Sequence, residues 1–149
     1  MRNAYARLKE EFPYAHMQIS GALGEAIRKG NQNSLNELIT SYFSKPETSE
    51  LLDGAIAFYI DDDEIPHMEV PAALAIMADS RNALRAILKA TRNPNAREDP
   101  DAPENSPTLL MQAILSSNID MVKLLLEEGA DVNEEWVYIN EDGEKILPY

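Results

Sequence analysis

The chain lacks residue types and patterns that several classes of function require. It contains no cysteine, which excludes disulfide bonds, thiolate zinc sites and a cysteine nucleophile. Its 2 histidines, His16 and His67, lie far apart in the sequence, so their spacing indicates no metal site. No run of about 18 apolar residues occurs, and we expect no membrane-spanning helix. The N-terminal sequence MRNAYARLKEEF is too polar for a signal peptide, which favours a cytoplasmic protein; delivery into another cell as an effector stays open.

Recognisable catalytic motifs are absent as well. No G-x-S-x-G nucleophile motif occurs. Gly21 and Gly24 form only a lone G-x-x-G, without the lysine and the longer loop that cradle a phosphate. The acidic run at residues 61–64 lacks the alternating ligands and the glycine of a calcium-binding loop, so we interpret it as a solvated helix end. We therefore expect no enzyme, no metal site and no cofactor.

Positive charge is scarce. The chain has 13 basic and 26 acidic side chains, a net charge of −13, and residues 97–149 carry −10 of it. Direct nucleic-acid binding is not expected because phosphates would be repelled. The acidic segment either serves solubility or attracts a basic partner protein. Arg81, Arg85, Lys89 and Arg92 share one helical face, which is either a solvated stripe or a contact for an acidic partner or for the acidic C-terminal part of a second copy.

The most regular part of the chain is residues 108–133, TLLMQAILSSNIDMVKLLLEEGADVN, which contain two short helical patterns separated by a polar break. The first helix has one apolar face, formed by Leu110, Ala113 and Ile114. The second has a buried stripe and is followed by Gly129, where a left-handed helix cap favours glycine. Two helices of this length cannot bury both apolar faces alone, so the pattern predicts stacked neighbours.

This stretch resembles an ankyrin repeat. Thr108, Leu110 and Ala113 fit the T-P-L-H-x-A opening of that family, residues 122–126 fit its second helix, and residues 129–133 fit its G-A-D-V-N close. Self-comparison finds two weaker copies when Ala75 and Ala26 are laid over Ala113. The separations are 49 and 38 residues, against roughly 33 in a regular array, so insertions interrupt the stack twice.

The sequence departs from the family pattern at two kinds of position. The histidine of the opening motif is Met111 in the third copy and Ala73 in the second, so the hydrogen bond that it makes between neighbouring repeats is expected to be missing. The glycine between the helices is kept only as Gly30, while Asp79 and Ser117 replace it in the later copies. These departures predict an irregular stack.

The resemblance implies an all-α fold: an ankyrin-repeat-like α-solenoid of about three helix pairs, with an extra helix and a C-terminal β-hairpin or cap. Within one domain at 1–149, we expect repeats at 21–43, 70–96 and 106–133, an N-terminal cap at 1–13 and a C-terminal cap at 134–149. The first insertion is amphipathic and predicts a helix near 48–60, either an added element or a degenerate repeat. The second, residues 97–107, predicts a loop. The tail is either a hairpin cap or the start of another repeat in a longer protein.

Ankyrin proteins engage partners through a concave face made by finger tips and first-helix surfaces, so the resemblance implies a protein-binding module without catalysis. The partner-binding positions that this places on the sequence are Arg28, Met77, Gln112 and Leu115 on the first helices, Asp99, Asp101 and Glu104 in the acidic loop, and Trp136 and Tyr138 in the tail. Aromatic residues often anchor interfaces, although Trp136 also suits covering the last repeat. The alternative function is a regulatory N-terminal domain of a larger protein, which could be an enzyme.

Overall fold

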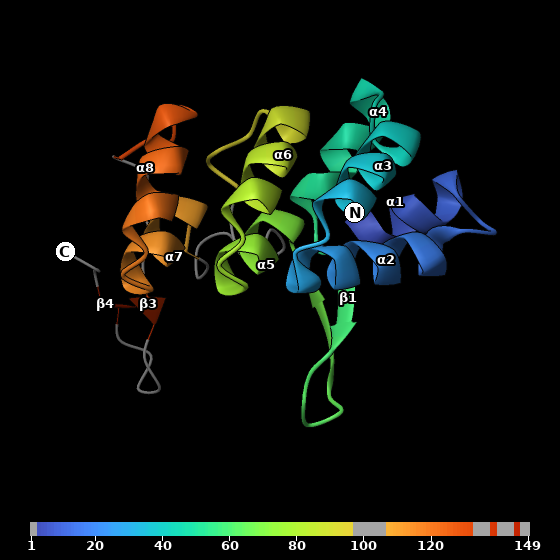
Figure 1. Cartoon of the computed structure of the whole chain (residues 1–149), viewed down its shortest axis with the longest axis horizontal. Coiled ribbons are helices and arrows are strands. Elements are labelled where there is room, and N and C mark those ends of the chain that lie inside the picture. The colour runs from blue at the N-terminus through green and yellow to red at the C-terminus, as the bar shows by residue number, and fades with distance from the viewer. Residues whose placement is uncertain (1–2, 97–106, 133–137, 140–144, 147–149) are drawn as a thin grey trace.

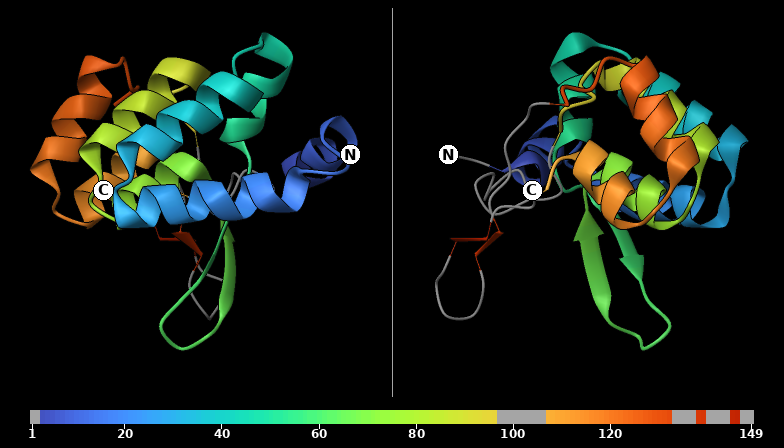
Figure 2. Two further views of the ribbon diagram at one scale, coloured as in Figure 1. Left: turned by 45° about the vertical axis from the view of Figure 1, so that its right-hand side comes forward. Right: turned by 90° about the vertical axis from the view of Figure 1, so that its left-hand side faces the viewer.

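Three pairs of antiparallel helices stand side by side in the computed structural model, which describes residues 3–96 and 107–132 and the short strands at 138–139 and 145–146 (Figure 1). The pairs are α2 (His16–Lys29) with α3 (Gln32–Tyr42), α5 (Pro71–Met77) with α6 (Arg81–Thr91), and α7 (Leu109–Leu115) with α8 (Ile119–Glu127). The first helices of the pairs form one layer, and the second helices form the other (Figure 2). The predicted ankyrin-like solenoid of three helix pairs is confirmed, and the described residues add two small two-stranded sheets to it.

The same backbone turn joins the two helices of every pair. The turn after each first helix contains a residue with a left-handed backbone. These residues are Gly30, Asp79 and Ser117, with φ of 69°, 54° and 54°. The next amide closes a Schellman cap: Asn31 N donates to Ala26 O at 2.9 Å, Ser80 N to Ala75 O at 2.9 Å, and Asn118 N to Ala113 O at 3.0 Å. The three acceptors are the alanines that the sequence comparison aligned, so the alignment of the three copies is confirmed.

Apolar faces of both layers meet in one continuous core. The largest fully buried side chains come from all three pairs and include Leu23, Ile27, Leu35, Leu74, Leu84, Ile87 and Leu109. Burying a side chain of this size stabilises the fold by about 1.5–3 kcal/mol. Much of this burial arises between neighbouring pairs, which explains why a single pair would not suffice.

Helix α1 (Ala4–Glu11) lies at the first end of the stack (Figure 1). Its N-terminus is capped by Asn3, whose side chain accepts a hydrogen bond from the amide of Ala6 at 2.8 Å. Leu8 is fully buried, and Tyr5 and Phe12 pack partly against the core. The apolar stripe of α1 therefore covers the outer side of the first helix pair.

The helix predicted near 48–60 is confirmed only in its first part, and the rest of the segment is a strand. A four-residue helix, α4 (Pro46–Ser49), leads into the 3-10 helix η1 (Glu50–Asp53), and the chain then forms strand β1 (Ala57–Ile60). This strand pairs antiparallel with β2 (Pro66–Glu69), and the pair extends away from the first-helix layer as a hairpin (Figure 2). The acidic residues 61–64 are consequently the tip of a hairpin and not the end of a helix.

The second insertion and most of the tail lie outside the described residues. Within the tail, β3 (Tyr138–Ile139) pairs antiparallel with β4 (Lys145–Ile146), in agreement with the hairpin predicted for this segment. Among the helices of the described part, none is long and apolar enough to cross a membrane.

Candidate functional site

Helix α2 lies along one edge of the hairpin, and its successive turns match the strand. Three residues spaced one helical turn apart meet alternate residues of β1 and of the position just before it: Ser20 meets Ile56, Gly24 meets Phe58, and Arg28 meets Ile60. The Ser20 hydroxyl donates to the Ile56 carbonyl at 2.5 Å, and the Arg28 guanidinium donates to the Ile60 carbonyl at 3.0 Å. The edge of β1 is therefore covered by a helix, which fixes the hairpin against the stack.

A short series of ring and charge contacts continues from Arg28 onto the hairpin. Its guanidinium carbon lies 4.6 Å from the centre of the Tyr59 ring, in a cation–π contact. Tyr59 stacks in turn on His67, with ring centres 4.8 Å apart and planes 14° apart. Nε2 of His67 lies 2.6 Å from Oδ2 of Asp61. These four side chains, taken from α2, both strands and the hairpin tip, hold the hairpin in one orientation.

Asp61 also shapes the hairpin tip. Its Oδ1 accepts hydrogen bonds from the amides of Asp63 and Ile65, both at 2.9 Å. The hydrogen bond to His67 holds the pKa of the Asp61 carboxyl below its usual value, and the amide of Ile65 adds to the effect. Burial raises the pKa of the nearby Tyr59, with the charge of Glu69 as the second cause. Asp61 thus stabilises the turn through its side chain. The other acidic residues of the tip are exposed to solvent.

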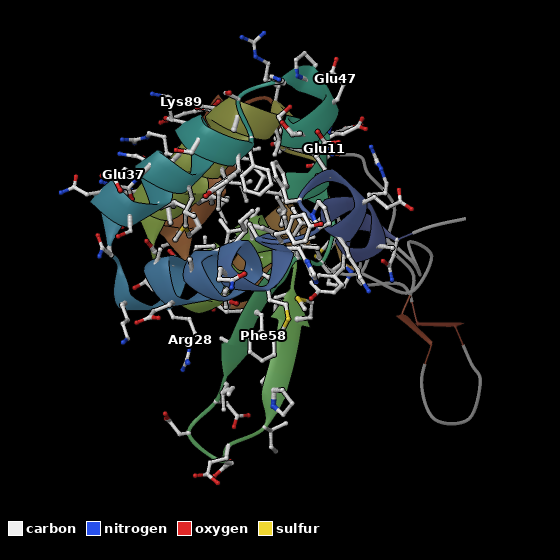
Figure 3. The ribbon with its side chains drawn as sticks, turned by 90° about the vertical axis from the view of Figure 1, so that its right-hand side faces the viewer. Glu11, Arg28, Glu37, Glu47, Phe58 and Lys89 are labelled. Carbon is white, nitrogen blue, oxygen red and sulfur yellow. The ribbon has the colours of Figure 1, made fainter. Side chains whose placement is uncertain are left out.

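Residues of α2 and of the hairpin line a surface groove with a volume of about 580 Å³, beside the line where the two elements pack together. Its walls include Gly21, Glu25 and Arg28 from the helix and Phe58, Ile60 and Asp62 from the hairpin. Figure 3 shows Arg28 on the hairpin side of α2 and Phe58 where the hairpin meets the stack. The groove mixes charges of both signs with apolar surface, which suits contact with a protein better than a dedicated anion or cation site.

Tyr59 and His67 are not among the predicted site residues, because Tyr59 falls in the helix expected near 48–60 and His67 is considered only as a metal ligand. A usable signal was present: the run AFYI is rich in aromatic and β-branched residues, an acidic turn follows, and a second short strand ends before Pro71. Within the described residues the first insertion forms a projecting finger. The fingers predicted in the acidic loop and around Trp136 lie outside those residues.

Three of the predicted site residues occupy equivalent positions on the exposed side of the first helices. Arg28, Met77 and Leu115 each lie two residues beyond the alanine whose carbonyl closes the turn. All three are exposed, and the apolar side chains of Met77 and Leu115 are 52% and 56% accessible. We call these residues the first-helix row. The structure brings them onto the layer from which the hairpin projects (Figure 2).

The placement of Gln112 on the binding surface is wrong. It is only 9% exposed, and its Nε2 donates to the carbonyl oxygen of Ala73 at 3.2 Å, which ties α7 to α5. A second bond joins the same two repeats, from Asn118 Nδ2 to Asp79 Oδ1 at 2.8 Å. The connection between repeats that was expected to be missing is therefore made by other residues.

The remaining predicted positions lie elsewhere. Asp99, Asp101, Glu104 and Trp136 are outside the described residues, and Tyr138 belongs to β3. The basic residues Arg81, Arg85 and Lys89 lie on α6, with the first and last exposed and Arg85 partly so. Figure 3 shows Lys89 on the second-helix layer, on the other side of the stack from Arg28. The basic face and the first-helix row are thus separate surfaces.

The third helix pair also exposes apolar side chains whose equivalents in the second pair are buried. Ile114 is 40% exposed, although its equivalent in the second pair, Ile76, is 3% exposed beneath the third pair. Leu126 is 44% exposed, and its equivalent Leu88 is 2% exposed. The outer side of the third pair is therefore built like a repeat interface.

The family described as Ankyrin repeats (3 copies) matches residues 23–135, well over half of the chain. The chain belongs to the ankyrin-repeat family. No curated protein matches its sequence. Ankyrin repeats are generally protein–protein interaction modules, and the first-helix row of this chain is exposed to solvent. Across residues 3–96, 107–132 and the two tail strands, no group of three His, Cys, Asp or Glu side chains is placed to hold a metal ion.

Proposed function

We propose that this ankyrin-repeat protein captures a partner protein across the first-helix row and the hairpin, as an adaptor or inhibitor without catalytic activity. The observation that carries the proposal is the pair Met77 and Leu115, two large apolar side chains left exposed at equivalent positions. Covering such a side chain gains about 1.5–3 kcal/mol, which makes each a candidate anchor. Arg28, the third member of the row, adjoins the hairpin groove and supplies a further contact.

The charge of the chain supports a basic partner. A net charge of −13 accelerates the approach of a positively charged protein and disfavours acidic ones. The exposed acidic residues of the hairpin tip lie on the same side of the stack as the row (Figure 2). In this proposal Asp99, Asp101 and Glu104 extend the acidic surface, Trp136 and Tyr138 add aromatic anchors, and the protein acts in the cytoplasm.

The proposal is tested by affinity capture from native cell extract with wild-type protein and with the double variant Met77→Ser, Leu115→Ser. We expect a reproducible partner to be retained by the wild type and lost by the double variant. The matched control is Leu126→Ser, which removes an equally exposed apolar side chain on the other helix layer. Retention of the same partner by the double variant would refute the row as the binding surface.

The acidic loop is tested separately, with Asp99→Asn, Asp101→Asn and Glu104→Gln combined in one variant. If these side chains attract a basic partner, the variant binds it more slowly and with a weaker dependence on salt concentration. Association rates measured at low and raised salt give both quantities. Unchanged rates and an unchanged salt dependence would remove the loop from the proposed surface.

Two further arrangements belong with this proposal. The basic residues Arg81, Arg85 and Lys89 would pair with the acidic C-terminal part of a second copy, and sedimentation at low salt would then reveal a dimer that Arg85→Glu abolishes. In the alternative function, the chain is a regulatory N-terminal domain of a larger protein. The position of the natural stop codon distinguishes a short adaptor from such a domain.

A further inference from the structure

A second groove runs between the turns of neighbouring repeats. It lies between the α5–α6 turn and the α7–α8 turn and has a volume of about 750 Å³. Met77 and Asp79 form one wall, Ile119 and Asp120 form the other, and the turn residues 116–118 lie between them. We call it the turn groove. Its width is fixed by the hydrogen bond from Asn118 Nδ2 to Asp79 Oδ1, because that bond joins the two turns.

The turn groove combines apolar rims with negative charge. Met77 is 52% exposed and Ile119 is 68% exposed, so both rims present large apolar side chains to solvent. Asp79 and Asp120 are exposed carboxylates, and none of the described residues that line the groove is basic. The basic residue nearest to Asp79 in the sequence, Arg81, lines a neighbouring groove on the other side of the α5–α6 turn, and Asp79 lies at the border of both grooves. A ligand that lies in the turn groove therefore meets two carboxylates beside two hydrophobic contacts.

We infer that the turn groove binds a short segment of the partner protein in which a large aliphatic side chain is flanked by arginine or lysine. This inference rests on the proposed function, because Met77 belongs both to the first-helix row and to the groove. The aliphatic side chain packs between Met77 and Ile119. The flanking cations pair with Asp79 and Asp120, whose charges have no basic counterpart among the lining residues that the structure describes.

Charge decides between the possible occupants. A segment rich in aspartate or glutamate would meet both carboxylates and the net charge of −13, so it is disfavoured on approach and in the groove. A purely apolar segment would bury the charges of both carboxylates without bringing a cation to them, which costs free energy. A basic residue beside an aliphatic one satisfies both surfaces, and it agrees with the basic partner that the overall charge favours.

The direct test uses capped tripeptides as probes and the methyl groups of Met77 and Ile119 as reporters in NMR titrations. The probes are Arg-Leu-Arg, Gln-Leu-Gln, Arg-Ala-Arg and Glu-Leu-Glu. We expect Arg-Leu-Arg to shift both methyl signals at concentrations roughly fivefold below Gln-Leu-Gln, as two exposed ion pairs would produce. Arg-Ala-Arg should bind more weakly than Arg-Leu-Arg, and Glu-Leu-Glu most weakly of all.

Internal and matched controls accompany the titration. The methyl group of Met17 is exposed elsewhere and should not shift at these concentrations. The double variant Asp79→Asn, Asp120→Asn should bind Arg-Leu-Arg and Gln-Leu-Gln equally, because asparagine tolerates the left-handed backbone at position 79 and removes only the charge. Equal binding of Arg-Leu-Arg and Glu-Leu-Glu to the wild type, or equal shifts at Met17, would overturn the inference.

Partner capture separates this inference from the proposed function. Ile119 lies in the groove but not in the first-helix row, so Ile119→Ser should weaken capture if the partner occupies the groove. The groove would be refuted, and the proposed function would stand, under one combination of results. The Met77→Ser, Leu115→Ser variant would lose the partner, while Ile119→Ser and the double asparagine variant would capture it fully. Full capture by the row variant would refute the proposed function, while the peptide titration would still decide the groove's preference.

Discussion

The carbonyl oxygen of Phe58 packs against the bare backbone of Gly24, so closely that a β-carbon on Gly24 would lie 1.9 Å from it. Any other residue at this position would push the hairpin away from α2. The two flanking contacts, from Ser20 and Arg28, depend on the same spacing because they lie one helical turn on either side. Gly24 is therefore the point at which the sequence permits an ankyrin helix pair to carry this finger.

Replacing Gly24 by alanine should destabilise the protein by about 1–2 kcal/mol, because the steric cost of overpacking exceeds the gain in helix propensity. The matched control is Gly21→Ala in the same helix, where a β-carbon meets nothing within 4 Å. That change should stabilise the protein by about 0.5–1 kcal/mol. Urea unfolding of both variants gives the comparison, and a gain in stability for Gly24→Ala would contradict the observed packing.

The contact between Arg28 and Tyr59 should appear as a coupling energy of about 0.5–1 kcal/mol in a double-mutant cycle with Arg28→Met and Tyr59→Leu. The physical reason is the position of the guanidinium over the ring, 4.6 Å from its centre. A parallel cycle with Lys29→Met and Tyr59→Leu is the control, since Lys29 pairs with Glu25. Equal coupling in both cycles would mean that the ring contact contributes nothing specific.

The repeat architecture was accessible from the sequence because it depends on local, periodic features. Laying Ala113 over Ala75 and Ala26 located the three Schellman caps, since a helix end needs a left-handed residue at a fixed distance from its last buried position. The same alignment placed Met77 and Leu115 on the exposed side of their helices. Periodicity was sufficient for these features.

The hairpin and the burial of Gln112 depend on contacts that periodicity does not report. Residues 51–59 show helical spacing, but Gly54 packs so tightly on Ala4 that a β-carbon there would lie 2.0 Å from that side chain, and the chain turns into a strand instead. The side chain of Gln112 is drawn inward by a carbonyl 39 residues away in the sequence. The first outcome depends on α1 and the second on the neighbouring repeat, and neither is visible in the local pattern.

Substituting Gln112 by methionine should cost less than about 1 kcal/mol. The change removes the hydrogen bond to Ala73, but it also removes a buried Oε1 atom that has no hydrogen-bond partner in the structure. Gln112→Ala should cost about 2 kcal/mol, because it leaves a cavity as well. Thermal or urea unfolding distinguishes the two variants, and an equal loss in both would show that the hydrogen bond outweighs the packing. Partner capture should not change, since the side chain is buried.

Asp53 should make the protein less stable as the pH rises from about 4 to above 6. Burial raises its pKa to about 6, and the charge of Glu50 also raises it, against a hydrogen bond from Asn93 that lowers it. Since the folded state holds this proton more tightly than the unfolded state, the stabilisation is complete below the ordinary value of 3.8 and is lost as the pH passes through about 6. The free energy of unfolding of Asp53→Asn should therefore rise by about 1 kcal/mol relative to that of the wild type between pH 4 and pH 7. This figure is already reduced for solvent screening at this partly exposed side chain.

Asn93→Ala should make the stability of the otherwise unchanged protein fall more steeply with pH, because it removes the hydrogen bond that favours the charged carboxylate of Asp53. Urea unfolding at pH 4, 5, 6 and 7 measures all three proteins, and a wild type and an Asp53→Asn variant with parallel pH profiles would contradict the raised pKa.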